Sequence, residues 1–319
     1  MVKLRRANKV THPGGCEIGP RPIDLHLKAL KSMGARIHDT NRGFISCEAD
    51  RLKGCDIQLD YPSVGATENV MLASVFAEGE TYIRNAAKEP EIVDLQNFLV
   101  NLGVNIYGAG TSVIRIKGCS GGLRNVEHSV IPDRIVAGTY MMAAAITGGD
   151  VYIKNVIPEH LTSAISNLRE SGCRINCKKN IIHLSGPIRP RAIDIIRTLP
   201  YPGFPTDMQA QMVAYLSIAR GTSIMVETVF ENRYKHVDEL LRMGANIKLE
   251  GRLAVIKGVK KLNGASVTAR DLRGGAALII AGLAAEGDTT INGLHHVERG
   301  YEDIDIKLAQ IGAKINKID

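Results

Sequence analysis

The chain contains no tryptophan and only five phenylalanines among its 319 residues. Proteins that bind single-stranded nucleic acid commonly stack bases on aromatic side chains. Lysine and arginine are dispersed along the chain, so the net charge of +7 suits small anionic ligands as well as nucleic acid. No apolar run reaches the length of a membrane span, and the basic start MVKLRRANKV lacks the apolar stretch of a signal peptide. Because aromatic side chains are few and the basic residues are dispersed, we expect no binding to nucleic acid. Because a membrane span and a signal peptide are lacking, we expect a cytoplasmic protein that does not bind membranes.

The six cysteines include no CxxC pair and no Cys/His spacing typical of zinc sites, so reduced thiols are expected. Cys16 differs from the rest because the glycines around it offer no apolar shell and a helix start with Arg21 follows. A helix N-terminus and a nearby cation lower the pKa of a thiol. Cys16 is therefore predicted to be reactive, the alternative being a buried thiol that fills space. The other five are assigned structural roles: Cys47, Cys55, Cys119, Cys173 and Cys177.

An internal repeat organises the chain. A glycine that ends a helix and precedes a strand recurs at a nearly constant spacing, and a second glycine recurs in phase with it. The second glycine lies within the segments FAEGETYIRN, ITGGDVYIKN, IARGTSIMVE and AAEGDTTING. Self-similarity at a fixed period indicates a repeat architecture. The first set comprises Gly34, Gly103, Gly172, Gly244 and Gly312, and the second comprises Gly79, Gly149, Gly221 and Gly287.

Each repeat is predicted to run strand, helix, strand, helix and then two strands. Its first helix is apolar nearly all round and is expected to be buried. Its second helix is amphipathic and ends at the glycine. Such units enclose their apolar helices within a ring of sheets, unlike a doubly wound sheet. The chain opens on a second helix, so we expect an incomplete first repeat and the absence of a segment that normally precedes it.

Three arginines precede the second helices of different repeats. Arg21 and Arg299 lie at the same spacing before the glycine that ends the helix, and Arg233 lies slightly closer to its glycine. A helix N-terminus carries partial positive charge, so an arginine placed there favours a bound anion. Its guanidinium recognises carboxylate or phosphate through paired hydrogen bonds. The triplet predicts an anion site, with chance surface placement as the alternative.

Polar residues also precede the apolar first helices. Asp207, in FPTDMQAQ, has an N-cap as its ordinary interpretation. Asp271 and Arg273 hold the equivalent place one repeat later, where a plain salt bridge is the alternative. The stretch from Ser63 to Thr67 supplies backbone N–H groups and a hydroxyl at another helix start, which suits phosphate.

These residues lie in segments that resemble the UDP-N-acetylglucosamine enolpyruvyl transferases of the EPSP synthase family. The segments are spread in order along the whole chain: PGGCEIGPRPIDLH, SVGAT, NAAKEPEIVDL, IPDRIVAGT, FPTDMQAQ, FENRYKHVDEL, DLRGGAAL and HHVERGYEDI. The resemblance implies an α/β fold, the inverse (inside-out) α/β barrel in two domains. A partial first domain covers 1–131 and a second domain covers 132–319.

The resemblance also implies a reaction and its residues. Phosphoenolpyruvate gives its enolpyruvyl group to the 3′-hydroxyl of UDP-N-acetylglucosamine and releases phosphate, without metal or organic cofactor, in the first committed step of peptidoglycan synthesis. Cys16 is the general acid toward C3 of phosphoenolpyruvate, and Asp207 takes the proton of the hydroxyl. Arg21, Arg233 and Arg299 hold the carboxylate and phosphate, and Asp271 and Arg273 are accessory. The nucleotide-sugar contacts are Arg21, Pro22, Ile23, Asp24, Leu25, His26, Ser63, Val64, Gly65 and Val229.

The chain departs from the family pattern at two places. The family begins with roughly another hundred residues, which include a Lys-Asn pair of the active site, and Tyr61-Pro62 replaces a group that commonly offers a lysine. The missing segment leaves two alternatives to a transferase that works alone: a non-catalytic nucleotide-sugar-binding paralogue, and one part of a split enzyme completed by an N-terminal polypeptide. A third alternative is the sister enzyme that uses shikimate phosphate on the same fold. The thiol loop and RPIDLH disfavour the last.

Overall fold

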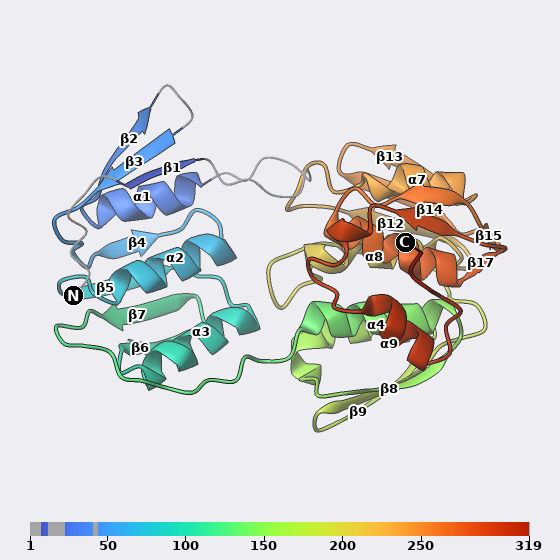
Figure 1. The fold of residues 1–319 in the computed structure, drawn as a ribbon, viewed down its shortest axis with the longest axis horizontal. Coiled ribbons are helices and arrows are strands. Elements are labelled where there is room, and N and C mark those ends of the chain that lie inside the picture. Colours follow the sequence, from blue (N-terminus) through green and yellow to red (C-terminus); the bar gives the residue numbers. More distant parts are fainter. Residues whose placement is uncertain (1–7, 12–22, 41–43, 319) are drawn as a thin grey trace. The chain divides into compact units, whose positions relative to one another are not determined.

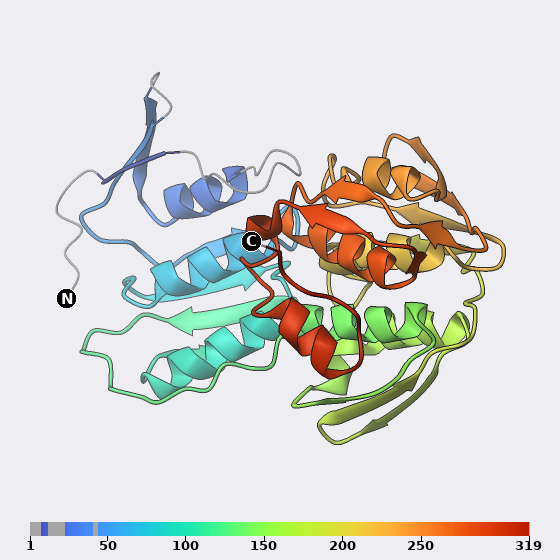
Figure 2. The ribbon, with the colours of Figure 1, turned by 45° about the vertical axis from the view of Figure 1, so that its right-hand side comes forward.

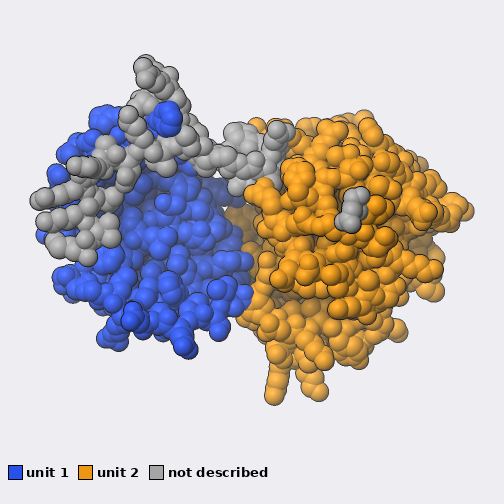
Figure 3. Space-filling view, viewed as in Figure 1, with its two compact units in different colours: residues 1–15, 21–131 blue, residues 16–20, 132–319 orange. Residues whose placement is uncertain are grey.

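The computed structural model describes residues 8–11, 23–40 and 44–318. These residues form two compact units, one ending at Ile131 and the other starting at Pro132 (Figure 3). Cys16, Arg21 and Pro22 of the predicted site lie outside the described residues.

The described part of the first unit contains two sheets and three helices (Figure 1). One sheet is antiparallel with the order β1-β3-β2, and the other has the order β4-β5-β7-β6 with only β4 and β5 parallel. The elements are β1 (Asn8–Thr11), α1 (Asp24–Ser32), β2 (Arg36–Thr40), β3 (Phe44–Glu48), β4 (Asp56–Gln58), α2 (Val64–Ser74), β5 (Glu80–Arg84), α3 (Pro90–Asn101), β6 (Asn105–Tyr107) and β7 (Val113–Lys117).

The described part of the second unit contains sheets in the orders β8-β10-β9 and β11-β12-β14-β13 and two parallel pairs, β15-β17 and β16-β18. Its helices are α4 (Arg134–Ile146), α5 (Thr162–Glu170), α6 (Gln209–Leu216), α7 (His236–Arg242), α8 (Leu272–Leu283) and α9 (Ile304–Gln310). Its strands are β8 (Asp150–Lys154), β9 (Arg174–Lys178), β10 (Ile181–Ser185), β11 (Ile195–Arg197), β12 (Thr222–Val226), β13 (Asn246–Glu250), β14 (Leu253–Lys257), β15 (Leu262–Asn263), β16 (Ser266–Thr268), β17 (Ala285–Glu286) and β18 (Thr290–Asn292).

Two repeats have the predicted order throughout. The repeats β4-α2-β5-α3-β6-β7 and β11-α6-β12-α7-β13-β14 also share one sheet order, in which the first two strands are parallel. The predicted strand before α4 is wrong, because residues 118–133 form no strand and contain three glycines, which weaken strands. The predicted strand after Gly312 is also wrong, since residues 313–318 pair with no other segment in the described chain.

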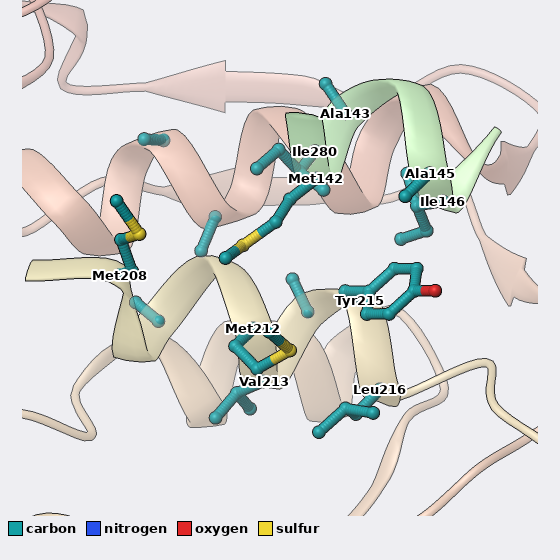
Figure 4. Close-up of a cluster of buried hydrophobic side chains, with 14 of the residues drawn as sticks. Met142, Ala143, Ala145, Ile146, Met208, Met212, Val213, Tyr215, Leu216 and Ile280 are labelled. Carbon is teal, nitrogen blue, oxygen red and sulfur yellow. The ribbon is translucent and has the colours of Figure 1, made fainter. Parts of the chain in front are cut away.

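The apolar first helices form the centre of the second unit. All eight residues of α6 are buried, together with ten residues of α4 and eight of α8. The three helices pack against one another, and the sheets lie outside them (Figures 1 and 2). Met142, Met212, Tyr215 and Ile280 meet in this core (Figure 4). The predicted burial is confirmed here, whereas in the first unit α2 leaves Leu72 53% exposed.

The glycines that end the second helices have the predicted role. Each adopts a positive φ just after its helix, at 93° for Gly34, 98° for Gly103, 107° for Gly172, 86° for Gly244 and 101° for Gly312. A side chain in this left-handed region is strained, and glycine is not. In the second set of glycines, one repeat uses Gly148 rather than Gly149 for the positive φ.

Replacing the glycine that ends α3 tests this assignment. We expect Gly103→Ala to lower the free energy of unfolding by about 1–2 kcal/mol, because alanine is strained at a φ of 98°. Gly121→Ala in the same unit is the control, since a Cβ there meets nothing within 4 Å and the φ of Gly121 is not positive. Urea titration of both variants measures the difference, and equal stability of the two would contradict it.

Candidate active site

The first unit brings two of the predicted segments together. Helices α1 and α2 pack against each other near their starts. A Cβ on Gly65 would lie 3.1 Å from Nε2 of His26, so the glycine leaves room for the imidazole. Burial lowers the pKa of His26, and the charge of Asp24 opposes this shift only partly. The imidazole is therefore held neutral at the place where RPIDLH meets SVGAT.

Ser63 confirms the predicted helix start at α2. Its Oγ accepts the backbone N–H of Ala66 at 3.3 Å, and its carbonyl accepts the hydroxyl of Thr67 at 2.8 Å. Oγ1 of Thr67 in turn accepts the backbone N–H of Ala87 at 3.1 Å. These bonds fix the start of α2 against the segment that follows β5. Tyr61, which departs from the family pattern, is 41% exposed two residues earlier.

A single cap position recurs in four repeats. In each repeat, the residue at one fixed distance before the glycine of the second set is the N-cap of the apolar helix or of the turn that leads into this helix. These residues are Ser63, Asp133, Pro205 and Asp271. The ordinary interpretation of Asp207 as an N-cap, which was the alternative to a functional role, does not hold. Asp207 lies two residues beyond the proline, inside the 3-10 turn Thr206–Met208, so its carboxylate is released from capping.

Two arginines contact the Asp207 carboxylate instead. Nη2 of Arg233 donates to Oδ1 of Asp207 at 2.5 Å, and Nε of Arg273 lies 3.7 Å from the same oxygen. The Arg233 side chain is 4% exposed and that of Arg273 is 15% exposed, whereas that of Asp207 is 44% exposed. Two nearly buried cations thus converge on one carboxylate that still faces solvent.

The arginines set the charge state of Asp207. Partial burial alone raises the pKa of this carboxyl, but the charges of Arg233, Arg273 and Arg134 and the hydrogen bond from Arg233 together hold its pKa below the ordinary value. Asp207 is therefore a carboxylate at neutral pH. The described residues donate to Oδ1 of Asp207 and not to Oδ2, so Oδ2 can accept a proton from a donor placed beside it.

The alternative of a plain salt bridge between Asp271 and Arg273 does not hold either. Asp271 caps α8 by accepting the backbone N–H groups of Arg273 at 3.0 Å and Gly274 at 2.9 Å. The Arg273 side chain turns toward Asp207 instead, and its Nη1 donates to the hydroxyl of Tyr301 at 3.1 Å. Its guanidinium also lies 5.5 Å from the centre of the Tyr301 ring.

Three buried residues that the sequence analysis did not single out support Arg273. The hydroxyl of Tyr301 lies 2.9 Å from Oγ1 of Thr139 and accepts Nε2 of Gln211 at 3.2 Å. Nε2 of Gln211 also donates to the backbone carbonyl of Asp207 at 3.0 Å. The motifs IPDRIVAGT, FPTDMQAQ and HHVERGYEDI contain these residues, but their contact depends on the packing of α4 and α6 against the segment before α9.

The arginine triplet is only partly described. Arg233 precedes α7 by three residues and Arg299 precedes α9 by five, so neither stands directly at a helix start. Both helices have only seven residues. Arg233 is buried beside Asp207, whereas Arg299 is exposed. The predicted placement of these two arginines at helix N-termini is therefore wrong, and the carboxylate of Asp207 is the partner of Arg233 instead.

Five cysteines within the described residues are free thiols: Cys47, Cys55, Cys119, Cys173 and Cys177. Of these only Cys173 is buried, and Cys177 is exposed, so a space-filling role fits Cys173 and not Cys177. Among those residues no three His, Cys, Asp or Glu side chains form a group suited to a metal ion. In the same part of the chain no helix is both long and apolar enough to cross a membrane.

A family model described as EPSP synthase (3-phosphoshikimate 1-carboxyvinyltransferase) matches residues 1–308. The chain belongs to the EPSP synthase family. It is 58% identical over 315 residues to UDP-N-acetylglucosamine 1-carboxyvinyltransferase 1 of Caldanaerobacter subterraneus subsp. tengcongensis, a match that covers 99% of the chain and 75% of the relative. It is 55% identical over 307 residues to the protein of that name from Carboxydothermus hydrogenoformans, covering 96% and 72%. The resemblance stated from the motifs is confirmed.

Solved structures of the family share the fold. The enolpyruvyl transferase NikO from Streptomyces tendae superposes with a TM-score of 0.86 at 24% identity, covering 99% of this chain and 75% of that one. EPSP synthase from Acinetobacter baumannii superposes with a TM-score of 0.72 at 21% identity, covering 97% and 74%. These likenesses confirm the predicted fold class, an α/β fold of the enolpyruvyl transferase type.

The lowered pKa of Asp207 predicts a pH-dependent stability. A carboxyl whose pKa is lowered by folding stabilises the fold at pH values above the pKa that it has in the unfolded chain, about 3.9. This contribution disappears as the pH falls through the lower pKa of the folded chain. Because solvent screens the partly exposed carboxylate, we expect Asp207→Asn to lower the free energy of unfolding at pH 7 by only about 1 kcal/mol.

The difference between this variant and the natural chain should narrow below about pH 4. Asp194→Asn, at an exposed position of the same unit, controls for the loss of a surface carboxylate. Urea titrations at pH 7 and pH 3 measure the effect, and a difference that does not change with pH would oppose the assignment.

Proposed function

We propose that the chain transfers the enolpyruvyl group of phosphoenolpyruvate to the 3′-hydroxyl of UDP-N-acetylglucosamine and releases phosphate. The relatives at 55–58% identity carry the name of this activity. The observation that carries the proposal within the chain is Asp207, an ionised carboxylate held between Arg233 and Arg273. This reaction is the first committed step of peptidoglycan synthesis, which we place in a bacterial cytoplasm.

The two compact units correspond to the two domains of the proposed enzyme. The first carries Ile23, Asp24, Leu25 and His26 at the start of α1 and Ser63, Val64 and Gly65 at the start of α2. These two helix starts supply the proposed contacts to the nucleotide sugar, together with Arg21 and Pro22. The second unit carries the proposed catalytic carboxylate, the arginines and Val229.

The arginines suit the charge of phosphoenolpyruvate. A carboxylate and a phosphate together need several cations, and buried guanidinium groups bind such oxygens more strongly than exposed ones. Arg233, Arg273 and Arg299 are the proposed ligands in the second unit, and Arg21 is a further proposed ligand. The Nε–H of Arg233 is buried and has no hydrogen-bond partner among the described residues, so we assign this donor to the anion.

The reaction needs an acid and a base. Cys16 is the proposed acid, which gives a proton to C3 of phosphoenolpyruvate and makes C2 electrophilic. The 3′-oxygen of the sugar then bonds to C2 as its proton passes to Asp207. Loss of the proton from C3 and departure of phosphate with the C2–O bond restore the enol ether. In this account Cys16 can also bond to C2 and form a covalent adduct.

An adduct on Cys16 gives a direct test. Incubation with phosphoenolpyruvate and UDP-N-acetylglucosamine should add mass at Cys16, as should the thiol-directed inhibitor fosfomycin in a parallel sample. Cys16→Ser should remove both adducts. Cys55→Ser should keep them, because burial and the neighbouring Asp56 raise the pKa of the Cys55 thiol and disfavour its thiolate. Peptide mapping by mass spectrometry is the measurement, and adducts that persist in Cys16→Ser would reject the assignment.

The base is tested separately. We expect Asp207→Asn to lower kcat by about 100-fold or more, because general base catalysis contributes 10²–10⁴-fold. The KM values should change less, since asparagine keeps the size of the side chain. Asp150→Asn is the control, with a carboxylate that is 58% exposed on β8. Phosphate release measures turnover, and a kcat within about twofold of the natural chain would exclude Asp207 as the base.

A further inference from the structure

Glu227 is a carboxylate with no exposed surface, directly after β12. Its Oε1 accepts the backbone N–H groups of Val229 at 2.8 Å and Phe230 at 3.1 Å and the hydroxyl of Thr198 at 3.0 Å. Its Oε2 accepts the hydroxyl of Thr206 at 2.9 Å. A buried carboxylate is tolerated only when donors replace its lost hydration. Here four donors meet one side chain.

The repeat architecture does not call for a carboxylate at this place. The tenth residue of each repeated segment is Asn85, Asn155, Glu227 or Gly293. The other three turn the chain with a positive φ, at 54° for each asparagine and 78° for the glycine. Glu227 does not share this conformation. The repeat that contains Asp207 has therefore replaced a turn residue with a buried acid.

The two oxygens of Glu227 hold two different segments. Oε1 holds the loop after β12, where Val229 is a proposed contact to the nucleotide sugar. Oε2 holds Thr206, the residue before Asp207. The carbonyl of Thr206 also accepts Nη2 of Arg233 at 3.2 Å, and Arg233 belongs to the same loop. Glu227 thus closes a ring of hydrogen bonds around the proposed base.

We propose that Glu227 is a positioning residue that fixes Asp207 and Arg233 relative to the loop of Val229. It touches no reacting atom and acts through Thr206 and the loop amides. The inference rests on the proposed function and deepens it, because the ring connects a proposed sugar contact with the group that receives the sugar proton. A displacement of about 1 Å at such a group can reduce rate by 10²-fold.

Two variants address the link to Thr206. Glu227→Gln keeps an acceptor for Val229, Phe230 and Thr198, but its N–H₂ group can only donate to the hydroxyl of Thr206, so a charge-assisted bond becomes a weaker neutral one. Thr206→Val removes the hydroxyl and keeps the branched shape. The matched control is Ser223→Ala on β12, which removes a buried hydroxyl that accepts the N–H of Ile193 at 3.0 Å on the same sheet.

Each of Glu227→Gln and Thr206→Val should lower kcat by about tenfold or more. The acid limb of the kcat profile should move to higher pH, because a displaced Asp207 loses part of the pKa-lowering contact with Arg233. The double variant should lose little beyond either single variant, since both act on the same link between residues 227 and 206. Ser223→Ala should lower the melting temperature while kcat and the pH profile stay unchanged.

The inference is overturned if Glu227→Gln and Thr206→Val behave like Ser223→Ala, with lower stability but an unchanged kcat and acid limb. It is also overturned if the effects of the two variants multiply in the double variant. Should one variant fail to fold, the other still decides between these outcomes. If the natural chain shows no turnover at saturating substrates, the proposed function fails, and the inference fails with it. If the natural chain turns over while both variants behave like Ser223→Ala, only the inference fails.

Discussion

The mutual burial of α4, α6 and α8 is the constraint on which the second unit depends. Each helix is apolar on nearly every side, so none can lie at a surface, and together they fill the centre while the sheets cover them. Their packing is close: a Cβ on Gly138 would lie 2.5 Å from Cε of Met208. Substitutions in this core act on the fold first and on the proposed site only through it.

The same packing brings polar helix starts into one neighbourhood. Asp133 and Asp271 cap their helices, and the arginines that follow them, Arg134 and Arg273, both lower the pKa of Asp207. In the repeat between them a proline occupies the cap position. Repetition thus supplies a ring of similar helix starts, and the one that lacks a capping side chain carries the carboxylate proposed as the base.

The sequence predicted what depends on local order. The glycines after the second helices, the apolar helices and two complete repeats could be predicted from spacing and composition, because each obeys a rule that acts within a few residues. For Asp207 and Arg273 the sequence offered a helix cap and a salt bridge with Asp271 as ordinary alternatives, and the structure shows neither. Thr-Asp before a helix usually indicates a cap, and nothing local shows that the proline has already taken that position. Tyr301, Gln211 and Glu227 stayed unnoticed because their roles come from residues distant in sequence.

The electrostatics of Asp207 restrict the order of events in the proposed reaction. A carboxylate with a lowered pKa is a weak base, so it cannot remove a proton from a free sugar hydroxyl in advance. The hydroxyl becomes acidic only as its oxygen bonds to carbon and gains positive charge. Carbon C2 must therefore be electrophilic before or while the proton moves, which requires protonation at C3. The arginines that weaken the base thus make the proposed acid indispensable.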